Sequence, residues 1–388
     1  MDVQDFWNNR ELLFASSSAA SAVIIGLMMF MAYRLIAGNR SSAFRLLLLA
    51  LSMLAVYHGL ALADGLNLLE GRSVPQLSGI LYIAAFVALN FAFFELYYRK
   101  RARTRAWFYG LLAVGVTIAV CNLLSATGQP VAGLADAVTR ERTNLLLALE
   151  DGYVLLLSAL FAVMFAPHLR QRTRYAVSLC FAFFGQLAAF LTRDFGASSP
   201  ILDLMSAILP VFYYIVLFMI LFERVVELMQ TAYRSSITDG LTDLYNRRFF
   251  TARLEKSLEH AGQDAVGAIF CDIDDFKKLN DTKGHQAADV VLKQAAAILR
   301  EETEGIGLAG RYGGEELVAF VHSASPDASA VAERIRSRIA KETIVTVSVG
   351  CALSKPGVKA EQLMKNADEA MYRSKRSGKN RVSLYDQL

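Results

Sequence analysis

The sequence predicts a protein in two parts, a membrane bundle of about seven α-helices followed by a smaller α+β domain. Three observations support this fold class. The chain of 388 residues is 54% hydrophobic, with a mean hydropathy of +0.35, which is high for a soluble protein. The apolar excess lies before residue 222, in runs near the length of about 20 residues that crosses a bilayer. Further along the chain, the short apolar run 265–271 and the apolar residues around the glycine pair at 313–314 predict β-strands.

Composition and cysteine spacing exclude two other classes of protein. The net charge of +4 is mild, and no basic stripe interleaves with aromatic residues, so we expect no nucleic-acid partner. The four cysteines contain no Cys-x-x-Cys pair, so neither a disulfide framework nor a zinc site is predicted. We interpret them as small buried hydrophobic residues. They are Cys121, Cys180, Cys271 and Cys351.

Seven apolar segments make up a predicted transmembrane sensory domain, residues 1–222. Residues 1–11 are polar and lack the basic start of a signal peptide, so we expect no cleaved leader. The predicted spans are 12–33, 46–68, 76–98, 107–127, 144–167, 175–192 and 200–222.

Basic residues are distributed unevenly among the loops between these spans. The first, third and fifth loops are rich in basic residues, represented by Arg40, Arg101 and Arg172, whereas the other loops mix acids and bases. Because basic loops stay on the cytoplasmic side, this alternation predicts an outside N-terminus. Seven spans then place the C-terminal domain in the cytoplasm. We therefore expect a multi-pass protein of the bacterial cytoplasmic (inner) membrane, with the lipid bilayer as a partner.

Ionisable residues inside the predicted spans are costly and therefore mark candidate functional positions. Apart from Glu95, which lies near a basic loop, they are His58, Asp64, Glu150, Asp151 and Asp203. We expect them to line an outward-facing sensor pocket for a cation, a small polar ligand or protons. Glu150 is the best single candidate, because it lies furthest from an interface among the acids. The alternative is that these side chains reach the headgroups or form hydrogen bonds between helices.

Residues 223–236 are predicted to form a juxtamembrane signalling helix. The last span continues into this segment without a Pro or Gly break. Phe222, Val226, Met229 and Tyr233 recur at the spacing of a coiled-coil seam, so we expect a parallel stalk. An ordinary amphipathic helix is the alternative interpretation.

Residues 311–317 combine a glycine pair with two acids. Apolar residues flank this stretch on both sides, which predicts a β-hairpin whose turn residues Gly313 and Gly314 adopt positive φ. Glu315 and Glu316 then lie at the tip, where the glycines leave space for a ligand to approach the backbone. A solvated hairpin tip is the alternative.

A second group of acids follows the apolar run 265–271. This run predicts a buried strand that delivers Asp272, Asp274 and Asp275 at its C-terminal end, where α/β sheets place ligands. A carboxylate there and another at the hairpin tip together suit Mg²⁺. That ion takes one or two protein carboxylates and completes its shell with water and substrate phosphates.

With other motifs in the same order, these stretches resemble the GGDEF family of diguanylate cyclases. The signature appears as Gly313-Gly314-Glu315-Glu316-Leu317. The further matching segments are residues 239–248, 272–277, 280–281, 284–289, 348–350, 367–372 and 375–381. The resemblance covers about residues 237–386, and we assign residues 237–388 to this domain.

The resemblance implies a ferredoxin-like nucleotidyl cyclase fold of the α+β class. Under this fold we expect helices at residues 245–261, 287–302, 328–341 and 360–376. We expect strands at residues 265–272, in a hairpin over residues 306–322, and at residues 343–351 and 381–385.

The resemblance also implies an activity, the condensation of two GTP into cyclic di-GMP with release of two pyrophosphates. The cofactor would be Mg²⁺ (or Mn²⁺). By position, Asp272 and Glu315 would be the metal carboxylates, and the backbone carbonyl of Ile273 a third ligand. Glu316 would either contribute to a metal or help to deprotonate the attacking hydroxyl. The expected catalytic residues are thus Glu315, Glu316 and Lys277.

The resemblance further implies how GTP is bound. Backbone amides after the predicted strand would cradle the phosphates, and lysine side chains would meet phosphate oxygens as point charges. Taken singly, each residue also suits an ordinary role in a turn or at a solvated helix end. The expected phosphate-binding residues are Asp275, Phe276, Lys277, Lys375 and Lys379. The expected guanine-reading residues are Asn280 and Asp289. Gly313 and Gly314 would leave room for the nucleotide.

A cyclic product requires two such domains, since each would bind one GTP and supply half of the active site. We therefore expect a symmetric homodimer. The stalk would then let a small ligand or ion sensed in the membrane domain decide whether the half-sites meet.

Departures from the family pattern leave a second function open. Leu317 replaces a Phe, and Asp243 and Ala288 replace glycines. Glu304 and Gly307 stand in place of an inhibitory Arg-x-x-Asp element, so we expect no product inhibition there. The alternative function is a catalytically weak or inactive receptor that binds GTP or cyclic di-GMP and signals by contact. A transporter is disfavoured, because no internal repeat is evident.

Overall fold

The computed structural model describes residues 10–38, 42–66, 68, 74–97, 102–127, 136–197, 199–261, 265–322 and 327–387. The chain divides into two compact units, Met1–Leu228 and Met229–Leu388. Each unit is described by itself below.

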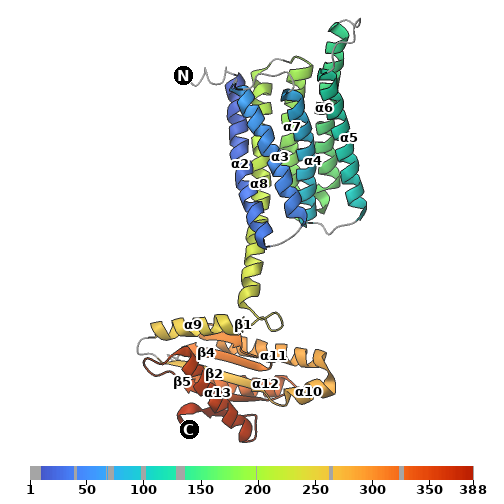
Figure 1. The fold of residues 1–388 in the computed structure, drawn as a ribbon. Coiled ribbons are helices and arrows are strands. Elements are labelled where there is room, and N and C mark those ends of the chain that lie inside the picture. The colour runs from blue at the N-terminus through green and yellow to red at the C-terminus, as the bar shows by residue number, and fades with distance from the viewer. Residues whose placement is uncertain are drawn as a thin grey trace. The chain divides into compact units, whose positions relative to one another are not determined.

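The first unit is a bundle of long helices (Figure 1). Its helices are α2 (Arg10–Gly38), α3 (Ser42–Gly65), α4 (Val74–Tyr97), α5 (Ala102–Thr127), α6 (Asp136–Met164), α7 (Arg172–Asp194) and α8 (Pro200–Ile237), with a short 3₁₀ turn, η1 (Ala166–His168), before α7. Within the described residues, seven helices are long and apolar enough to cross a membrane. The expected number of long apolar helices and their approximate positions are therefore confirmed, and their passage through a membrane stays a prediction.

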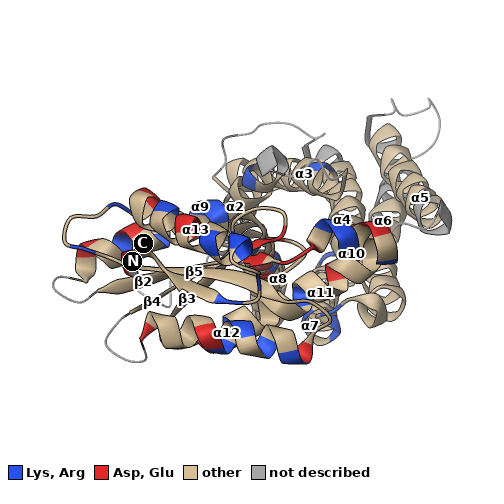
Figure 2. Ribbon diagram, turned by 90° about the horizontal axis from the view of Figure 1, so that it is seen from below, with Lys and Arg blue, Asp and Glu red and all other residues tan. Residues whose placement is uncertain are grey.

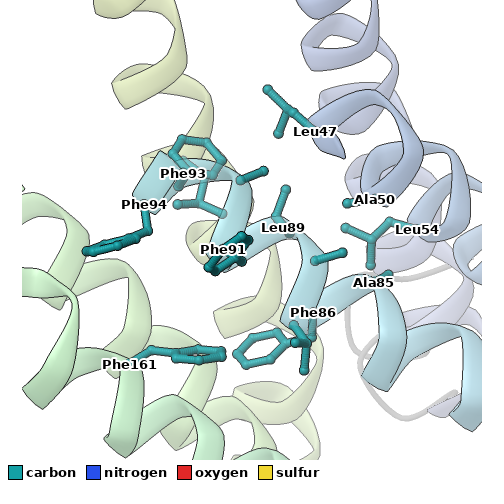
Figure 3. Close-up of a cluster of buried hydrophobic side chains, with 14 of the residues drawn as sticks. Leu47, Ala50, Leu54, Ala85, Phe86, Leu89, Phe91, Phe93, Phe94 and Phe161 are labelled. Atoms are coloured by element: carbon teal, nitrogen blue, oxygen red, sulfur yellow. The ribbon is translucent and has the colours of Figure 1, made fainter. Parts of the chain in front are cut away.

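Helix α4 lies at the centre of the bundle. In its most apolar stretch 61% of the residues are buried, against 22–39% in the other candidate spans. Leu47 and Leu54 of α3 pack toward α4, and Phe86 of α4 faces Phe161 of α6 with ring centroids 6.1 Å apart (Figure 3). A helix that is apolar all round is expected in such a central position.

Helix α8 runs for 38 residues without interruption, and Pro210 lies inside it. The expected continuity of the last span with the juxtamembrane segment is thus confirmed. Phe222, Met229 and Tyr233 are exposed along it, whereas Val225 and Leu228 pack against the core of the bundle. The exposed apolar side chains include most of the predicted seam, and whether they pair with a second copy stays a prediction.

The start of the stalk part of α8 is held by charged side chains around the beginning of α7. Arg174 and Gln171 both contact the Glu223 carboxylate. Arg170 forms an ion pair with Glu227 at 2.8 Å. We call this group, Arg170, Gln171, Arg174, Glu223 and Glu227, the juxtamembrane clasp.

The second unit is built on one mixed sheet (Figure 1). Its strands are β1 (Tyr245–Asn246), β2 (Val266–Ile273), β3 (Gly307–Arg311), β4 (Glu316–His322), β5 (Val347–Leu353) and β6 (Val382–Leu384). Among the described residues the strand order is β1-β3-β4-β2-β5-β6. Strands β3, β4, β2 and β5 are antiparallel neighbours in the order of a ferredoxin-like fold, so the expected α+β class is confirmed.

Helices cover both faces of this sheet, and their charged residues stand out against the mostly uncharged bundle (Figure 2). The helices are α9 (Arg247–His260), α10 (Phe276–Lys283), α11 (His285–Thr303), α12 (Ala328–Glu342) and α13 (Ala360–Arg376), followed by the 3₁₀ turn η2 (Tyr385–Gln387). One core joins β2 to α11 and α12, and the other joins it to α9 and α13. Gly350 of β5 allows α13 close contact, because a Cβ there would lie 2.0 Å from the carbonyl oxygen of Ala367.

Three local expectations were wrong or incomplete. Strand β5 begins at Val347 and not at 343, because Thr343 ends α12 by donating its hydroxyl to the Ile339 carbonyl. The eight-residue helix α10 was not foreseen. Strand β1 was assigned to a helix, although its two residues pair with Gly310 and Arg311 of β3.

Candidate active site

The glycine-pair hairpin connects β3 and β4 through residues 312–315. The backbone N–H of Tyr312 donates to the Glu316 carbonyl at 2.9 Å, which closes the loop. The hairpin is confirmed, but the expected positive φ is wrong, since neither Gly313 nor Gly314 takes such a conformation. A four-residue loop does not need the backbone twist of a two-residue turn. A Cβ at Gly313 would lie 2.3 Å from Glu316 Oε2, so a side chain at this position would displace the end of the Glu316 side chain.

Arg311 holds the shape of this loop from below. Its guanidinium donates to the Gly314 carbonyl from Nη2 at 2.7 Å and from Nε at 3.1 Å, and to the Gly313 carbonyl at 3.2 Å. Nη1 forms an ion pair with Asp239 at 2.8 Å. Burial acts to raise the pKa of Asp239, but hydrogen bonds from Thr242 and Arg311 lower it overall. An ionised Asp239 thus orients the arginine whose other nitrogens hold the glycine carbonyls.

The strand register brings Asp272 and Glu316 side by side. Asp272 at the end of β2 is the direct partner of Glu316 on β4. Opposite partners on neighbouring antiparallel strands point to the same face. Asp272 is buried, with 5% of its surface exposed, and Lys375 Nζ from α13 lies 2.6 Å from its Oδ1. Glu315 is half-buried one residue before Glu316.

Negative charge is crowded in this cluster. Burial raises the pKa of Asp272; the ammonium of Lys375 opposes this, while Glu315 and Asp274 add to it. Burial also raises the pKa of Glu316, and Asp272, Asp368 and Glu315 raise it further. Carboxylates with this arrangement favour any cation that approaches them.

The donor set suits a hard divalent cation. Among the described residues, no three Asp, Glu, His or Cys side chains are grouped closely enough to hold a metal alone. Mg²⁺ needs only one or two protein carboxylates. Asp272, Glu315 and the carbonyl of Ile273 offer oxygen only, and the Lys375 ammonium already stands beside Asp272 as a positive charge. The residues present therefore fit the expected metal, and their roles as ligands stay a prediction.

The three acids Asp272, Asp274 and Asp275, at or just after the end of β2, have three different environments. Asp274 is buried and accepts hydrogen bonds from Thr346 Oγ1 at 2.6 Å, from Ser348 Oγ at 2.7 Å and from the backbone N–H of Asn380 at 3.1 Å. It therefore ties the end of β2 to β5 and to the segment after α13. Asp275 is exposed and adopts a left-handed conformation, with φ of 54°.

Asp275 precedes the first turn of α10. The backbone amides expected to cradle phosphates, those of Asp275, Phe276 and Lys277, therefore lie at a helix N-terminus, as anion binding requires. Lys379 Nζ contacts Asp275 Oδ1 at 2.7 Å, and this lysine lowers the pKa of Asp275. Lys277 is exposed.

The expected guanine-reading residues lie on either side of the α10–α11 junction. Asn280 Oδ1 and His285 Nδ1 are 3.1 Å apart. Asp289 is exposed one turn after His285 on α11, so it shares that helix face. Ala288, by contrast, is buried. Its methyl group therefore lies inside the domain.

The five expected sensor residues have different exposures and partners, and a shared pocket stays a prediction. Asp64 is exposed, and Asp203 forms an ion pair with Arg10 at 3.1 Å. Asp151 pairs with Arg193 at 3.2 Å. The two remaining contacts are those of His58 Nε2 with the Tyr214 hydroxyl at 3.2 Å and of Glu150 with Asn122 at 2.7 Å.

Sequence reasoning missed several residues that shape the site. Asp239 and Arg311 were quoted only as parts of motifs, and their pairing joins positions 72 residues apart. Asp274 and Asp368 were given no role. The presence of a charged residue in an otherwise apolar strand context was the available signal for Arg311, since such a residue needs a partner.

Comparison with known proteins agrees with this geometry. Residues 236–381 match the family model described as diguanylate cyclase, GGDEF domain. The response regulator PleD of Caulobacter vibrioides is 42% identical over 161 residues, which cover 38% of this chain and 36% of PleD. The diguanylate cyclase DosC of Escherichia coli is 33% identical over 172 residues, covering 41% of this chain and 37% of DosC.

A solved structure is similar over the same part. It is the coiled coil and GGDEF domain of DgcB from Caulobacter crescentus in complex with c-di-GMP, at 33% identity, covering 42% of this chain and 92% of that chain, with a TM-score of 0.40. The chain spans little more than a third of the length of PleD and of DosC. The family match identifies the C-terminal part of the chain as a GGDEF domain. This domain is homologous to those of PleD and DosC.

Proposed function

We propose that the protein is a membrane-bound diguanylate cyclase whose output is controlled by a signal sensed in the helical bundle. The match of residues 236–381 to the cyclase domain carries this proposal. It is supported by the acidic cluster of Asp272, Glu315 and Glu316 beside a helix N-terminus. No observation favours the alternative of an inactive receptor.

The proposed reaction consists of two equivalent substitutions. In each, the 3′-oxygen of one GTP attacks the α-phosphorus of the other, and a new P–O bond forms. The bond between the α- and β-phosphates breaks, and pyrophosphate leaves. The hydroxyl proton passes to a base, for which Glu316 is the candidate because its raised pKa favours proton uptake. Two such steps yield one cyclic di-GMP and two pyrophosphates.

Asp272, Glu315 and the Ile273 carbonyl would hold Mg²⁺ (or Mn²⁺). When bound, the metal supplies positive charge that neutralises the triphosphate and makes the hydroxyl more acidic. The chain's own residues then position the nucleotide. Gly314 is exposed, and no atom lies within 4 Å of where its Cβ would be, so the loop leaves room for a ligand against its backbone.

Two lysines would exchange partners when GTP binds. Lys375 and Lys379 contact Asp272 and Asp275, respectively. A triphosphate carries more negative charge than one carboxylate, so each ammonium would move to phosphate oxygens and release its acid. Asp272 would thereby become free for the metal in the same event that brings the phosphates.

The remaining parts of the proposal concern the whole chain. The seven helices would span a bacterial cytoplasmic membrane, with the N-terminus outside and the GGDEF domain in the cytoplasm. Two copies would be needed, because each domain provides one GTP and half of the site.

The test is turnover by the purified full chain in lipid nanodiscs with GTP and Mg²⁺. We expect cyclic di-GMP and pyrophosphate in a ratio of about one to two, as the reaction stoichiometry above requires. Glu315→Ala should abolish product formation, whereas Glu304→Ala, a control at an exposed residue, should retain it. The absence of product from the wild type at every lipid composition and pH tried would count against the proposal.

A further inference from the structure

Glu150 meets Asn122 inside the helical bundle. Glu150 lies on α6 and is 7% exposed, and Asn122 lies on α5 and is fully buried. Asn122 Nδ2 donates to Glu150 Oε2 at 2.7 Å. Both carboxylate oxygens lie against Gly79 of α4, since a Cβ built on Gly79 would be 2.9 Å from Oε1 and 3.1 Å from Oε2. Three helices therefore meet at this carboxyl group.

Two buried oxygen atoms of this pair are left without a hydrogen bond to any residue that the structure describes. Glu150 Oε1 and Asn122 Oδ1 are both buried acceptors, and neither has a hydrogen-bond partner among the described residues. Buried polar atoms are almost always paired, because an unpaired one loses its bonds to water without compensation. Asn90, elsewhere in the same bundle, shows the usual case. It donates to the Tyr213 hydroxyl at 3.0 Å and accepts from the Tyr175 hydroxyl at 2.8 Å.

The charges around the pair do not supply the missing partner. On its own helix Glu150 is followed by Asp151, a further negative charge. The nearby cation is Arg193 of α7, which lies 3.2 Å from Asp151 Oδ2. Gln186 of α7 also donates to Asp151, at 2.7 Å. Where α5 and α4 contact Glu150 they contribute Asn122 and Gly79, neither of which titrates.

We propose that Glu150 and Asn122 form a proton-binding site through which external pH acts on the bundle. A proton on Glu150 Oε1 would donate to Asn122 Oδ1, while Asn122 Nδ2 continues to donate to Oε2. The result is a closed acid–amide pair in which both orphan atoms are satisfied. The inference rests on the proposed sensory role of the bundle and names its ligand.

A proton suits this site better than a metal cation. Hard cations take about six oxygen ligands, whereas the pair offers two free oxygens. Contact with Gly79 also leaves little space beside Oε1. A proton needs neither extra ligands nor volume.

The site has a physical connection to the stalk helix. Gly79, which contacts Glu150, lies on α4, and Asn90 of the same helix donates to Tyr213 of α8. A change of charge at Glu150 alters how closely α4, α5 and α6 can pack, because an ionised carboxylate demands more solvation than a neutral one. Helix α4 can pass such a shift to α8.

The first test is infrared difference spectroscopy of the full chain in nanodiscs during a pH titration. We expect a carbonyl band of a protonated carboxylic acid that disappears as pH rises and is absent in Glu150→Gln. This variant is isosteric, and its amide can both accept from and donate to Asn122, so it should fold. Asp151→Asn, the neighbouring control, should keep the band. An unchanged band in Glu150→Gln would overturn the proposal.

Asn122→Leu provides an independent check. It removes both the donor to the ionised carboxylate and the acceptor for the acid proton, so the midpoint of the band should move away from the wild-type value, and an unchanged midpoint would overturn the pairing. A midpoint that moves when sodium replaces potassium would show that a cation competes for the site, and would overturn assignment to a proton alone. These spectra do not depend on turnover, so they separate this proposal from the cyclase itself.

The second readout is the pH dependence of cyclic di-GMP synthesis. We expect Glu150→Gln to fix the rate at the wild-type low-pH level, with at least a threefold smaller pH response, while Asp151→Asn follows the wild type. A titrating Glu150 band together with identical pH–rate profiles for the wild type and Glu150→Gln would overturn the sensory role. It would leave the cyclase assignment intact.

Discussion

At Glu316, the protonated form stabilises the fold, whereas the proposed reaction uses the ionised form. Its pKa is raised by burial and by Asp272, Asp368 and Glu315. The folded state therefore binds this proton more tightly than the unfolded chain does. The resulting stability is present at low pH and is lost as pH rises through the raised pKa, in a window above the ordinary value of 4.5.

Replacing Glu316 with Gln should therefore stabilise the metal-free protein at neutral pH. We expect the melting temperature of the C-terminal unit at about pH 7 to rise by about 2 °C, the equivalent of roughly 0.5–1 kcal/mol. Below the window the gain should vanish. Turnover with GTP and Mg²⁺ should fall about 100-fold or more if Glu316 accepts the proton. Thermal denaturation in chelator checks the first point, with Glu304→Gln as the control. Equal pH dependence in wild type and variant would refute it.

Asp274 is a structural residue although it stands in the acidic motif. Because it is buried and accepts three hydrogen bonds, Asp274→Ala leaves those donors without a partner. We expect a loss of about 3 kcal/mol, which lowers the melting temperature of this unit by roughly 6–12 °C. Asp275→Ala is the matched control. It removes an exposed contact to Lys379 and should change the melting temperature little. Similar losses in both variants would contradict this distinction.

The three acids near the end of β2 show the limit of sequence reasoning at the residue scale. The residues after the apolar run 265–271 predict a carboxylate cluster, and the predicted strand end at residue 272 lies one residue before the end of β2 at Ile273. Asp272, Asp274 and Asp275 are chemically alike in the sequence, however, and only the fold separates them. Asp272 is paired with Glu316 across the sheet. Asp274 is buried and accepts hydrogen bonds from two hydroxyl groups, and Asp275 directly precedes α10.

At the scale of elements, the β3–β4 hairpin depends on a forked side chain. Arg311 contacts Asp239 and both glycine carbonyls at once, and lysine cannot reproduce that geometry. We expect Arg311→Lys to raise the KM for GTP about tenfold with a smaller effect on kcat, because the loop that approaches the nucleotide loses its support. Steady-state kinetics measures this. A variant with wild-type KM would show that the loop is rigid without Arg311.

The juxtamembrane clasp gives a second prediction at this scale. Glu223→Arg places like charges beside Arg174 and should change the resting rate of cyclic di-GMP synthesis by up to about fivefold, since exposed ion pairs contribute about 1 kcal/mol or less. The double variant Arg174→Glu with Glu223→Arg restores opposite charges and should recover the wild-type rate. A double variant no better than the single one would argue that the clasp does not position α8.

Long, strongly patterned elements were predictable, and short ones were not. The seven apolar helices follow from apolar runs long enough to cross a bilayer, and helices α11, α12 and α13 agree with those that the family resemblance implies. Helix α10 has eight mostly polar residues and no buried side chain, so it lacks that signal. Strand β1 exists only through its pairing with β3, which connects segments about 65 residues apart. We expect a two-residue turn at Gly313 and Gly314 from the sequence, but the pairing of β3 with β4 leaves a loop of residues 312–315.

At the scale of the whole molecule, the proposed reaction requires two copies of the chain. The exposed Phe222, Met229 and Tyr233 on α8 provide an apolar stripe that a second stalk could cover. Such a short seam is weak alone, but anchoring in a membrane raises the local concentration of its partner. The bundle would then act by changing how often two half-sites meet.

The most direct test of this account is cyclic di-GMP synthesis in nanodiscs that hold either one or two copies of the full chain. Dilute single-copy discs allow no encounter between domains. We therefore expect product from two-copy discs and at least a 100-fold lower rate per chain from single-copy discs. Two-copy discs of Glu315→Ala should be silent. Equal rates per chain in both preparations would contradict the shared site, and no product from two-copy discs would contradict the cyclase itself.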